Sequence, residues 1–212
     1  TELALADFGA PPLVENGVVS VVGGSRLQGH RFRIPGDFSS AAFFIGAAAF
    51  LPGSELAVTN VGLNPTRAAL LDVLQRMGAD IQIEVNSNLP SKEPVGTVRV
   101  RGTSLHGVDV EPDIIPSLID ELPILSVVAA FAEGSTRIQG ASELRVKESD
   151  RLAAILEGLS AIGAQVESMD DGFVVHGGAP LHPAELKSYG DHRMVMAWAI
   201  AALGVDGEHR HL

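Results

Sequence analysis

The chain has 212 residues, 46% of them hydrophobic, which is enough to bury a sizeable core. Its net charge is −11, from 26 acidic against 15 basic residues, and no run of five or more Lys and Arg occurs, which argues against nucleic acid as a partner. The absence of Cys excludes disulfides and thiolate chemistry, and since the sequence indicates neither a signal peptide nor a membrane span, we expect a cytoplasmic protein without a membrane partner.

Five helices are predicted along the chain from the spacing of its apolar residues. Three are apolar on nearly all sides, which indicates burial at the centre of the domain, and they span residues 39–51, 120–132 and 191–203. Residues 65–77 and 150–162 have apolar side chains at helical spacing with polar faces between them, which is typical of helices at a surface or between layers. Pro65 suits the first turn of its helix.

These helices belong to a repeated unit. Each apolar helix is followed by a Gly-Ser turn and a strand, and each surface helix ends in Gly-Ala before two short strands. The helix C-cap glycines expected to be left-handed are Gly9, Gly78 and Gly163. The unit reads β-α-β-α-β-β in tandem, which predicts an α/β fold with buried central helices and outer sheets. Thr1 begins midway through a unit and the unit at Asp191 is unfinished, so we expect both termini to be cuts through a larger protein.

Charged residues gather beside one of the apolar helices. The segment ELRVKESDR, residues 143–151, has six charged side chains and accompanies the apolar run 122–132. This density indicates a site, although the same residues also open a predicted helix, where a solvated charged start is ordinary. Each apolar helix also begins with polar residues, at 36–40, 119–123 and 190–193. Three helix N-termini that face one cleft would attract anions.

Single polar residues at helix starts have an ordinary explanation, because Ser and Asp are common N-caps, and we assign Asp37 and Asp191 to capping. Asp120 differs, since an acidic residue follows it and the apolar PSLI precedes it. A partly desolvated carboxylate and a general-base role are therefore expected there. Arg151 and Arg193 also lie at helix starts, where the dipole disfavours a base, so anion binding explains their placement better than stability does.

Five segments carry the most specific pattern, namely GDFSSAAFFIGAA, NPTRAALLDVLQRMGA, IDELPILSVVAAFAEG, ELRVKESDR and DHRMVMAWAI. Through them the chain resembles, over essentially its whole length, the 5-enolpyruvylshikimate-3-phosphate synthase family of the shikimate pathway. The resemblance implies transfer of the enolpyruvyl group from phosphoenolpyruvate to the 5-hydroxyl of shikimate 3-phosphate, with release of phosphate and without metal or cofactor. It also implies two domains, each of three such units around buried helices.

The same resemblance implies roles for five residues. Asp120 would take the proton from the attacking 5-hydroxyl, and Glu148 would transfer a proton at the enolpyruvyl carbon. Arg151 and Arg193 would hold the carboxylate and phosphate of phosphoenolpyruvate, because positive charge arranged in advance stabilises a dianion. Lys147 would contact shikimate 3-phosphate.

The chain also departs from the family. The early Lys and Arg, the Ser-rich phosphate-binding segment and the late Lys have no counterparts here, so we expect only part of a site. Relative to the family, residues 1–34 resemble the end of one domain, a partial repeat. Residues 35–212 resemble most of the second domain, with two full repeats and an unfinished third.

Alternatives remain open at this stage. One is a non-catalytic, anion-binding fragment of the same fold, and another is the UDP-N-acetylglucosamine enolpyruvyl transferase, which commonly has a loop Cys that this chain lacks. A complementing polypeptide would supply the missing half. Because unfinished repeats expose strand edges, residues 1–34 are also expected to pack onto the unit at Asp191, or two chains to exchange these pieces.

Overall fold

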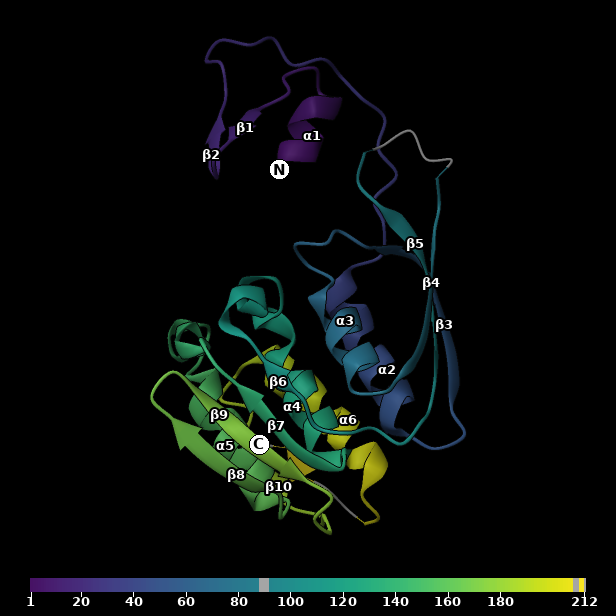
Figure 1. The fold of residues 1–212 in the computed structure, drawn as a ribbon, viewed down its shortest axis with the longest axis vertical. Coiled ribbons are helices and arrows are strands. Elements are labelled where there is room, and N and C mark those ends of the chain that lie inside the picture. The colour runs from purple at the N-terminus through teal and green to yellow at the C-terminus, as the bar shows by residue number, and fades with distance from the viewer. Residues whose placement is uncertain (88–91, 208–209, 212) are drawn as a thin grey trace.

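The computed structural model describes residues 1–87, 92–207 and 210–211. The chain begins with three short elements, which are α1 (Glu2–Asp7), β1 (Leu13–Glu15) and β2 (Val18–Ser20). In Figure 1 these lie apart from the other elements, which form one body below them. Among the described residues, no helix is both long and apolar enough to cross a bilayer.

The first full repeat opens with a parallel bridge between Gly36 and Val61 in place of a longer strand. It continues with α2 (Phe38–Phe50), β3 (Glu55–Gly62), α3 (Ala69–Arg76), β4 (Asp80–Val85) and β5 (Val95–Arg101). The three strands form an antiparallel sheet in the order β3-β5-β4. The bridge residue Gly36 adds a parallel neighbour to β3, so the unit keeps its predicted first position.

The second repeat has the same order with a longer first strand. Its elements are β6 (Asp109–Val110), α4 (Leu122–Phe131), β7 (Gly134–Ile138), α5 (Arg151–Ala161), β8 (Gln165–Met169) and β9 (Gly172–Gly177). The sheet order is β6-β7-β9-β8, with β6 parallel to β7 and the other pairs antiparallel. A third unit follows as β10 (Glu185–Leu186), α6 (His192–Ala201) and β11 (Arg210–His211). The predicted β-α-β-α-β-β order in an α/β fold is therefore confirmed.

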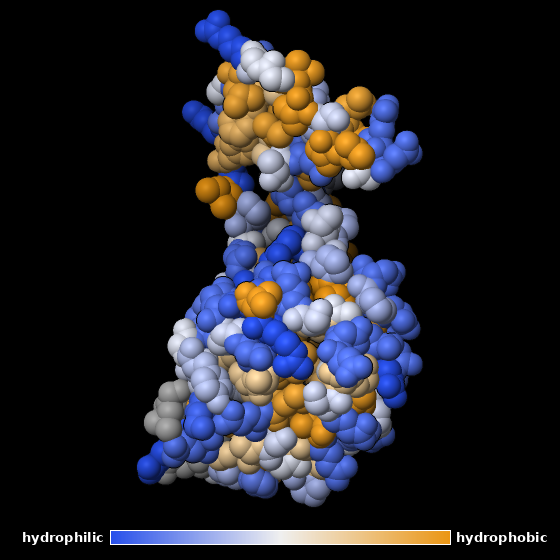
Figure 2. All heavy atoms as spheres, turned by 90° about the vertical axis from the view of Figure 1, so that its left-hand side faces the viewer, coloured by the Kyte–Doolittle hydropathy of each residue, from blue (hydrophilic) through white to orange (hydrophobic). Residues whose placement is uncertain are grey.

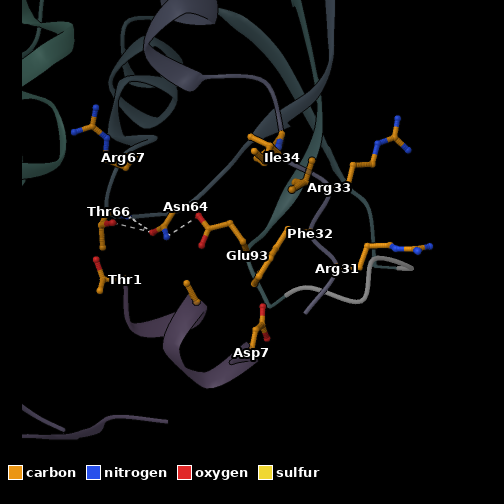
Figure 3. A pocket seen from close by; sticks show the side chains of 13 residues that line it. Thr1, Asp7, Arg31, Phe32, Arg33, Ile34, Asn64, Thr66, Arg67 and Glu93 are labelled. Carbon is orange, nitrogen blue, oxygen red and sulfur yellow. Dashed lines mark hydrogen bonds between the residues drawn. The ribbon is translucent and has the colours of Figure 1, made fainter. Parts of the chain in front are cut away.

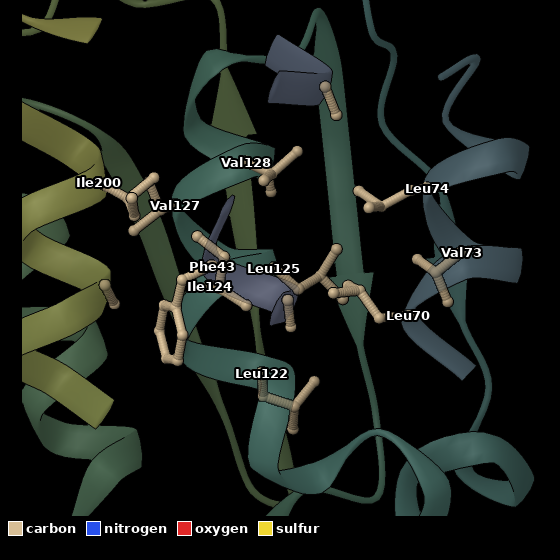
Figure 4. Close-up of a cluster of buried hydrophobic side chains, with 14 of the residues drawn as sticks. Phe43, Leu70, Val73, Leu74, Leu122, Ile124, Leu125, Val127, Val128 and Ile200 are labelled. Atoms are coloured by element: carbon tan, nitrogen blue, oxygen red, sulfur yellow. The ribbon is translucent and has the colours of Figure 1, made fainter. Parts of the chain in front are cut away.

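The apolar helices form the centre of the body. Helix α4 packs against both α2 and α6, and Figure 4 shows its side chains between those of α3 and α6. In α2, 11 of the 13 residues are buried, so the helix has no broad solvent face. Gly46 permits this packing, because a Cβ there would lie 2.7 Å from the side chain of Ile124 in α4. The prediction of buried central helices with sheets outside is confirmed.

The surface helices differ from the prediction at one end. Gly9, Gly78 and Gly163 have φ values of +84°, +97° and +92°, so the predicted left-handed caps are confirmed. However, α3 begins at Ala69, and the placement of Pro65 in its first turn was wrong. The side chain of Asn64 accepts the N–H of Thr66 at 3.0 Å, and this local turn holds the residues before α3 outside the helix.

Residues 1–34 contact the first repeat and lie far from α6, so their predicted packing onto the unit at Asp191 is not what this structure shows. The Asp7 carboxylate accepts the N–H of Lys92 at 3.3 Å. A pocket of about 510 Å³ separates the two parts, lined by Phe32 on one side and Thr66 on the other (Figure 3). Figure 2 shows hydrophobic residues gathered on the surface of this upper part.

Candidate active site

Asp120 lies where the starts of the three buried helices meet. It belongs to the 3-10 helix Ile119–Glu121 that leads directly into α4, and 20% of its side chain is exposed. Ser39 stands in the first turn of α2 and contacts Glu121, and Arg193 stands in the first turn of α6 and contacts Asp120. The polar residues at these three starts therefore come together, although they are far apart in sequence.

Four basic side chains surround the Asp120 carboxylate. On Oδ2, Arg67 donates hydrogen bonds from Nη1 and Nη2 at 3.2 and 3.1 Å, and Nη2 of Arg193 lies 3.7 Å away. On Oδ1, Nη1 of Arg151 lies at 3.5 Å and Nζ of Lys147 at 3.8 Å. These four basic residues come from three segments of a chain whose net charge is −11, so positive charge is concentrated at this point.

Arg151 is held in place by carboxylates. Only 1% of its side chain is exposed, and its Nε and Nη2 donate to the two oxygens of Asp191 at 2.7 and 3.3 Å. Nη2 also contacts Glu148 at 2.5 Å. Nη1, which faces Asp120, is buried and has no hydrogen-bond partner among the described residues. A buried guanidinium costs free energy unless it is paired, so Asp191 stabilises Arg151 as well as its own helix.

Asp191 and Asp37 also confirm the capping assignment. Asp191 accepts the backbone N–H of Arg193 at 2.9 Å, and Asp37 accepts that of Ser40 at 2.7 Å. Both carboxylates thus stabilise helix starts, and Asp191 has the additional partner described above.

The five residues singled out in the sequence belong to one connected cluster. Lys147, Arg151 and Arg193 contact Asp120 directly, while Glu148 is linked to it through Arg151. Glu148 is 56% exposed at its side chain, so it is open to a ligand. Their individual roles stay predictions.

Three further residues join the cluster, namely Glu121, Ser39 and Arg67, and none of them was among the five predicted from the sequence. The side chain of Glu121 is 2% exposed, and Ser39 Oγ donates a hydrogen bond of 2.5 Å to its Oε1. Ser39 Oγ in turn accepts from Nη2 of Arg67 at 3.1 Å. Arg67 went unnoticed because it was placed inside a helix starting at Pro65. An Arg lies near the start of both surface helices, in TRAA before α3 and in DRLAA at the first residue of α5, and this parallel between Arg67 and Arg151 was the available signal.

The two neighbouring carboxyl groups respond oppositely to their surroundings. Burial favours a higher pKa for Asp120, but the charges of Arg193, Arg67 and Lys147 outweigh it and lower the pKa. Burial raises the pKa of Glu121, and neither the Ser39 hydrogen bond nor the nearby arginines cancel that effect. Asp191 resembles Asp120, since burial is outweighed by hydrogen bonds from Arg151 and Arg193 and its pKa is lowered.

The arrangement suits one kind of chemistry. Four cations around a single partly exposed carboxylate can receive an anionic ligand in addition to Asp120. Asp120 can then act on a proton of that ligand or of a second molecule, because it stays ionised and is reached by solvent. Glu121 is closed off from solvent and cannot meet a ligand directly.

Comparisons with known proteins agree on one family. The family model described as EPSP synthase (3-phosphoshikimate 1-carboxyvinyltransferase) matches residues 1–210. Two curated relatives of that name, from Synechococcus sp. and Synechocystis sp., are 53% and 54% identical to the chain over 98% of its length. Each alignment covers 47% of the relative, so the chain spans about half the length of these proteins.

Solved structures give the same result. An EPSP synthase from Acinetobacter baumannii is 38% identical with a TM-score of 0.91, over 98% of this chain and 48% of that one. The enolpyruvyl transferase NikO from Streptomyces tendae is 24% identical with a TM-score of 0.70, over 96% of this chain and 45% of that one, a likeness of fold alone.

Proposed function

Because the chain belongs to the EPSP synthase (3-phosphoshikimate 1-carboxyvinyltransferase) family, we propose that it carries one part of a site for enolpyruvyl transfer. In this reaction the enolpyruvyl group of phosphoenolpyruvate passes to the 5-hydroxyl of shikimate 3-phosphate, and phosphate is released. The observation that carries the proposal is the convergence of four bases on the Asp120 carboxylate. Both substrates are phosphorylated anions, and this cluster offers them cationic partners.

In the proposed reaction Asp120 accepts the proton of the attacking 5-hydroxyl. A general base must be ionised and within reach of the proton. Of the two adjacent carboxylates, Asp120 is partly exposed, whereas Glu121 is buried. Its lowered pKa makes it a weak base, so binding of the anionic substrates has to offset part of the surrounding positive charge. Glu148, which is exposed beside Arg151, transfers a proton at the enolpyruvyl carbon.

Three of the four basic residues around Asp120 bind substrate in this proposal. Arg193, with 16% of its side chain exposed, and Nη1 of Arg151 face the place where the carboxylate and phosphate of phosphoenolpyruvate would lie beside Asp120. Lys147 contacts shikimate 3-phosphate from the same side, where its ammonium group is held at 3.0 Å from Glu143.

We further propose that residues 1–34 end one domain and residues 35–212 form most of a second. The separation of α1, β1 and β2 from the body in Figure 1 supports this division. The remaining part of the site then comes from a complementing polypeptide or a further part of a longer chain, since the chain spans about half of its curated relatives. A cytoplasmic location stays part of the proposal.

The test is phosphate release from phosphoenolpyruvate and shikimate 3-phosphate. The 212-residue chain is assayed alone, and then mixed with the other half of the Synechocystis relative as a separate polypeptide, with the Asp120→Asn chain as a control. Binding of phosphoenolpyruvate to the chain is measured in parallel by calorimetry. We expect release only in the mixture, and none with the control chain.

Two results would overturn the proposal in different ways. Phosphate release by the chain alone would contradict the assignment of a partial site. Binding of phosphoenolpyruvate without release in any mixture would favour the alternative of a non-catalytic, anion-binding fragment.

A further inference from the structure

A buried carboxylate next to the proposed base calls for a physical explanation. Glu121 has 2% of its side chain exposed and lies beside Asp120 in sequence, so two acidic groups are adjacent in a partly desolvated place. Burying a carboxylate costs several kcal/mol, and an apolar side chain or a Gln would avoid that cost. The capping of α4 does not explain Glu121 either, because its side chain makes no cap hydrogen bond there.

Glu121 is instead the end of a chain of hydrogen bonds that leads to Asp120. Ser39 donates to Glu121 at 2.5 Å and accepts from Arg67 Nη2 at 3.1 Å. The same Nη2, together with Nη1, donates to Oδ2 of Asp120. The guanidinium of Arg67 thus has a fixed acceptor on one side and Asp120 on the other.

Arg67 needs such a fixed acceptor more than the other bases do. Its side chain is 44% exposed, whereas those of Lys147, Arg193 and Arg151 are 23%, 16% and 1% exposed. It also lies in the turn before α3, outside the regular helix. A long exposed side chain loses conformational entropy when it is ordered, and the Ser39 hydrogen bond offsets part of that loss.

Resting on the proposed function, we infer that Ser39 and Glu121 hold Arg67, and that Arg67 positions the Asp120 carboxylate for proton transfer. Arg67 is the residue whose side chain donates hydrogen bonds to this carboxylate in the described part of the chain, while the other three bases lie 3.5 to 3.8 Å away. Four residues therefore supply charge, whereas the side-chain hydrogen bonds to the carboxylate come from Arg67, and Arg193 donates to the backbone oxygen of Asp120 at 3.2 Å. Glu121, Ser39 and Arg67 are positioning residues.

The charged groups around Asp120 define what a titration would report. Arg67 lies before α3 and Lys147 before α5. Arg151 is the first residue of α5, and Arg193 lies in the first turn of α6. Four carboxylates lie behind these basic residues, namely Glu143 at Lys147, Glu148 and Asp191 at Arg151, and Glu121, which is 3.7 Å from Arg193 and 4.0 Å from Arg67. A change at Ser39 alters none of these charges, so any effect on Asp120 must pass through Arg67 or Glu121.

The first experiment needs no activity. The carboxyl resonances of Asp120 and Glu121 are followed by NMR against pH in the wild-type chain and in Ser39→Ala, Arg67→Gln, Glu121→Gln and Arg101→Gln. The last variant removes an arginine from an exposed pair with Glu55 and is the charge control. We expect Arg67→Gln to raise the Asp120 midpoint most, Ser39→Ala to raise it less, and the control to leave it unchanged.

Glu121→Gln separates charge from geometry, because the Gln oxygen can still accept from Ser39. We expect its Asp120 midpoint to stay closer to that of the wild type than the midpoint of Ser39→Ala does. Suppose that Ser39→Ala leaves the titration midpoint of Asp120 unchanged while Arg67→Gln raises it. Arg67 then acts through its charge alone, without being positioned by Ser39, and the inference is wrong.

The second experiment uses the complemented transferase described above. Ser39→Ala and Arg67→Gln are each expected to lower kcat about 10-fold or more with a smaller change in KM for phosphoenolpyruvate, since small displacements of a catalytic group are costly. Arg67→Lys keeps the positive charge but loses the pair of hydrogen bonds from the guanidinium to Asp120. Its kcat should therefore be almost as low as that of Arg67→Gln. If the NMR titrations give the expected shifts but the complemented mixture releases no phosphate, the proposed function is wrong and the positioning inference still holds.

Discussion

At the scale of single residues, the site depends on the contrast between Asp120 and Glu121. The two side chains are adjacent in sequence, yet the bases around Asp120 lower its pKa while burial raises the pKa of Glu121. The difference follows from the positive charges close to Asp120 and from the deeper burial of Glu121. One carboxylate thus stays ionised and open to a ligand, and the other is enclosed behind it.

This contrast predicts the pH dependence of stability. The folded pKa of Glu121 is raised above its ordinary value of 4.5, so its carboxyl group destabilises the fold increasingly as pH rises from there through the folded pKa. Glu121→Gln should therefore unfold at higher urea concentration than the wild type at pH 7, and the difference should disappear below pH about 4. Urea titrations across this range, followed by circular dichroism, measure it.

Asp120→Asn provides the opposite sign in the same titrations. The folded pKa of Asp120 is lowered, so its stabilising contribution is present above the ordinary value of 3.8 and is lost as pH falls through the folded pKa. The Asn variant should be less stable than the wild type at pH 7 and equal to it only in strong acid. If the unfolding free energies of the wild type, Glu121→Gln and Asp120→Asn change with pH in parallel, the opposite pKa shifts of Asp120 and Glu121 are contradicted.

The pair of Arg151 and Asp191 predicts a large loss of stability. Both side chains are at most 1% exposed, so Asp191→Asn removes the buried negative charge on Arg151 and leaves its guanidinium with the more exposed carboxylates of Glu148 and Asp120. Such changes cost about 3 to 5 kcal/mol of unfolding free energy. Chemical denaturation at neutral pH gives the value, and Glu55→Gln in the exposed pair with Arg101 is the control, with an expected cost below about 1 kcal/mol. A loss as small as that of the control would mean that water reaches Arg151.

At the scale of elements, the repeat was predictable because helix periodicity and left-handed glycines are written locally in the sequence. The apolar helices, the order of helices and strands along each unit and the caps at Gly78 and Gly163 all follow from such local signals. The start of α3 did not, because the Asn64 side chain stabilises a turn that competes with the helix. Arg67 was missed for the same reason.

Other errors arose where side-chain surroundings decide the outcome. Read from the sequence alone, the aromatic residues Tyr189 and Trp198 are both core candidates, and Trp198 is indeed fully buried. Tyr189 is 51% exposed, and its hydroxyl contacts Glu157 on the surface of α5. The clustering of Asp120 with Arg151 and Arg193 was expected only through family resemblance, because contacts between residues more than 30 apart are not encoded in any local pattern.

The packing of α5 on α6 gives a prediction at this scale. Ala is a better helix former than Gly by about 1 kcal/mol, so Gly158→Ala in α5 would stabilise an isolated helix. In this fold, however, a Cβ at Gly158 would lie 2.2 Å from the Trp198 ring. We expect a net loss of about 1 to 3 kcal/mol from overpacking. Thermal unfolding should show it.

Ser160→Ala is the matched control, because Ser160 is exposed in the same helix. It should gain slightly in stability from helix propensity alone. If Gly158→Ala were as stable as Ser160→Ala, the close approach of α5 to Trp198 would be contradicted.

At the scale of the whole molecule, residues 1–34 differ from the body. No residue of α1, β1 or β2 is buried, and β1 and β2 pair only with each other among the described strands. Exposed apolar side chains on this part include Leu13, Val14, Val18 and Val19. Figure 2 shows such residues forming a hydrophobic surface, which in a soluble assembly is usually covered by another protein surface.

This surface predicts self-association of the chain when no complementing polypeptide is present. Sedimentation velocity should show a weight-average mass that rises with concentration above 22.2 kDa. Val14→Lys with Val18→Lys should reduce the association, because charges on an exposed strand disfavour edge contacts. Phe44→Lys, an exposed position on α2, is the control. Equal association of both variants would place the contact elsewhere.

The proposed chemistry depends on Asp120 as the general base among four cations. The most direct measurement is the rate of phosphate release by the complemented transferase with Asp120→Asn, together with the Kd for phosphoenolpyruvate. We predict that kcat falls about 10²- to 10⁴-fold while phosphoenolpyruvate binds at least as tightly, because one negative charge beside the four bases is gone. A kcat close to that of the wild type would contradict the assignment, and weaker binding of phosphoenolpyruvate would contradict the proposed anion site.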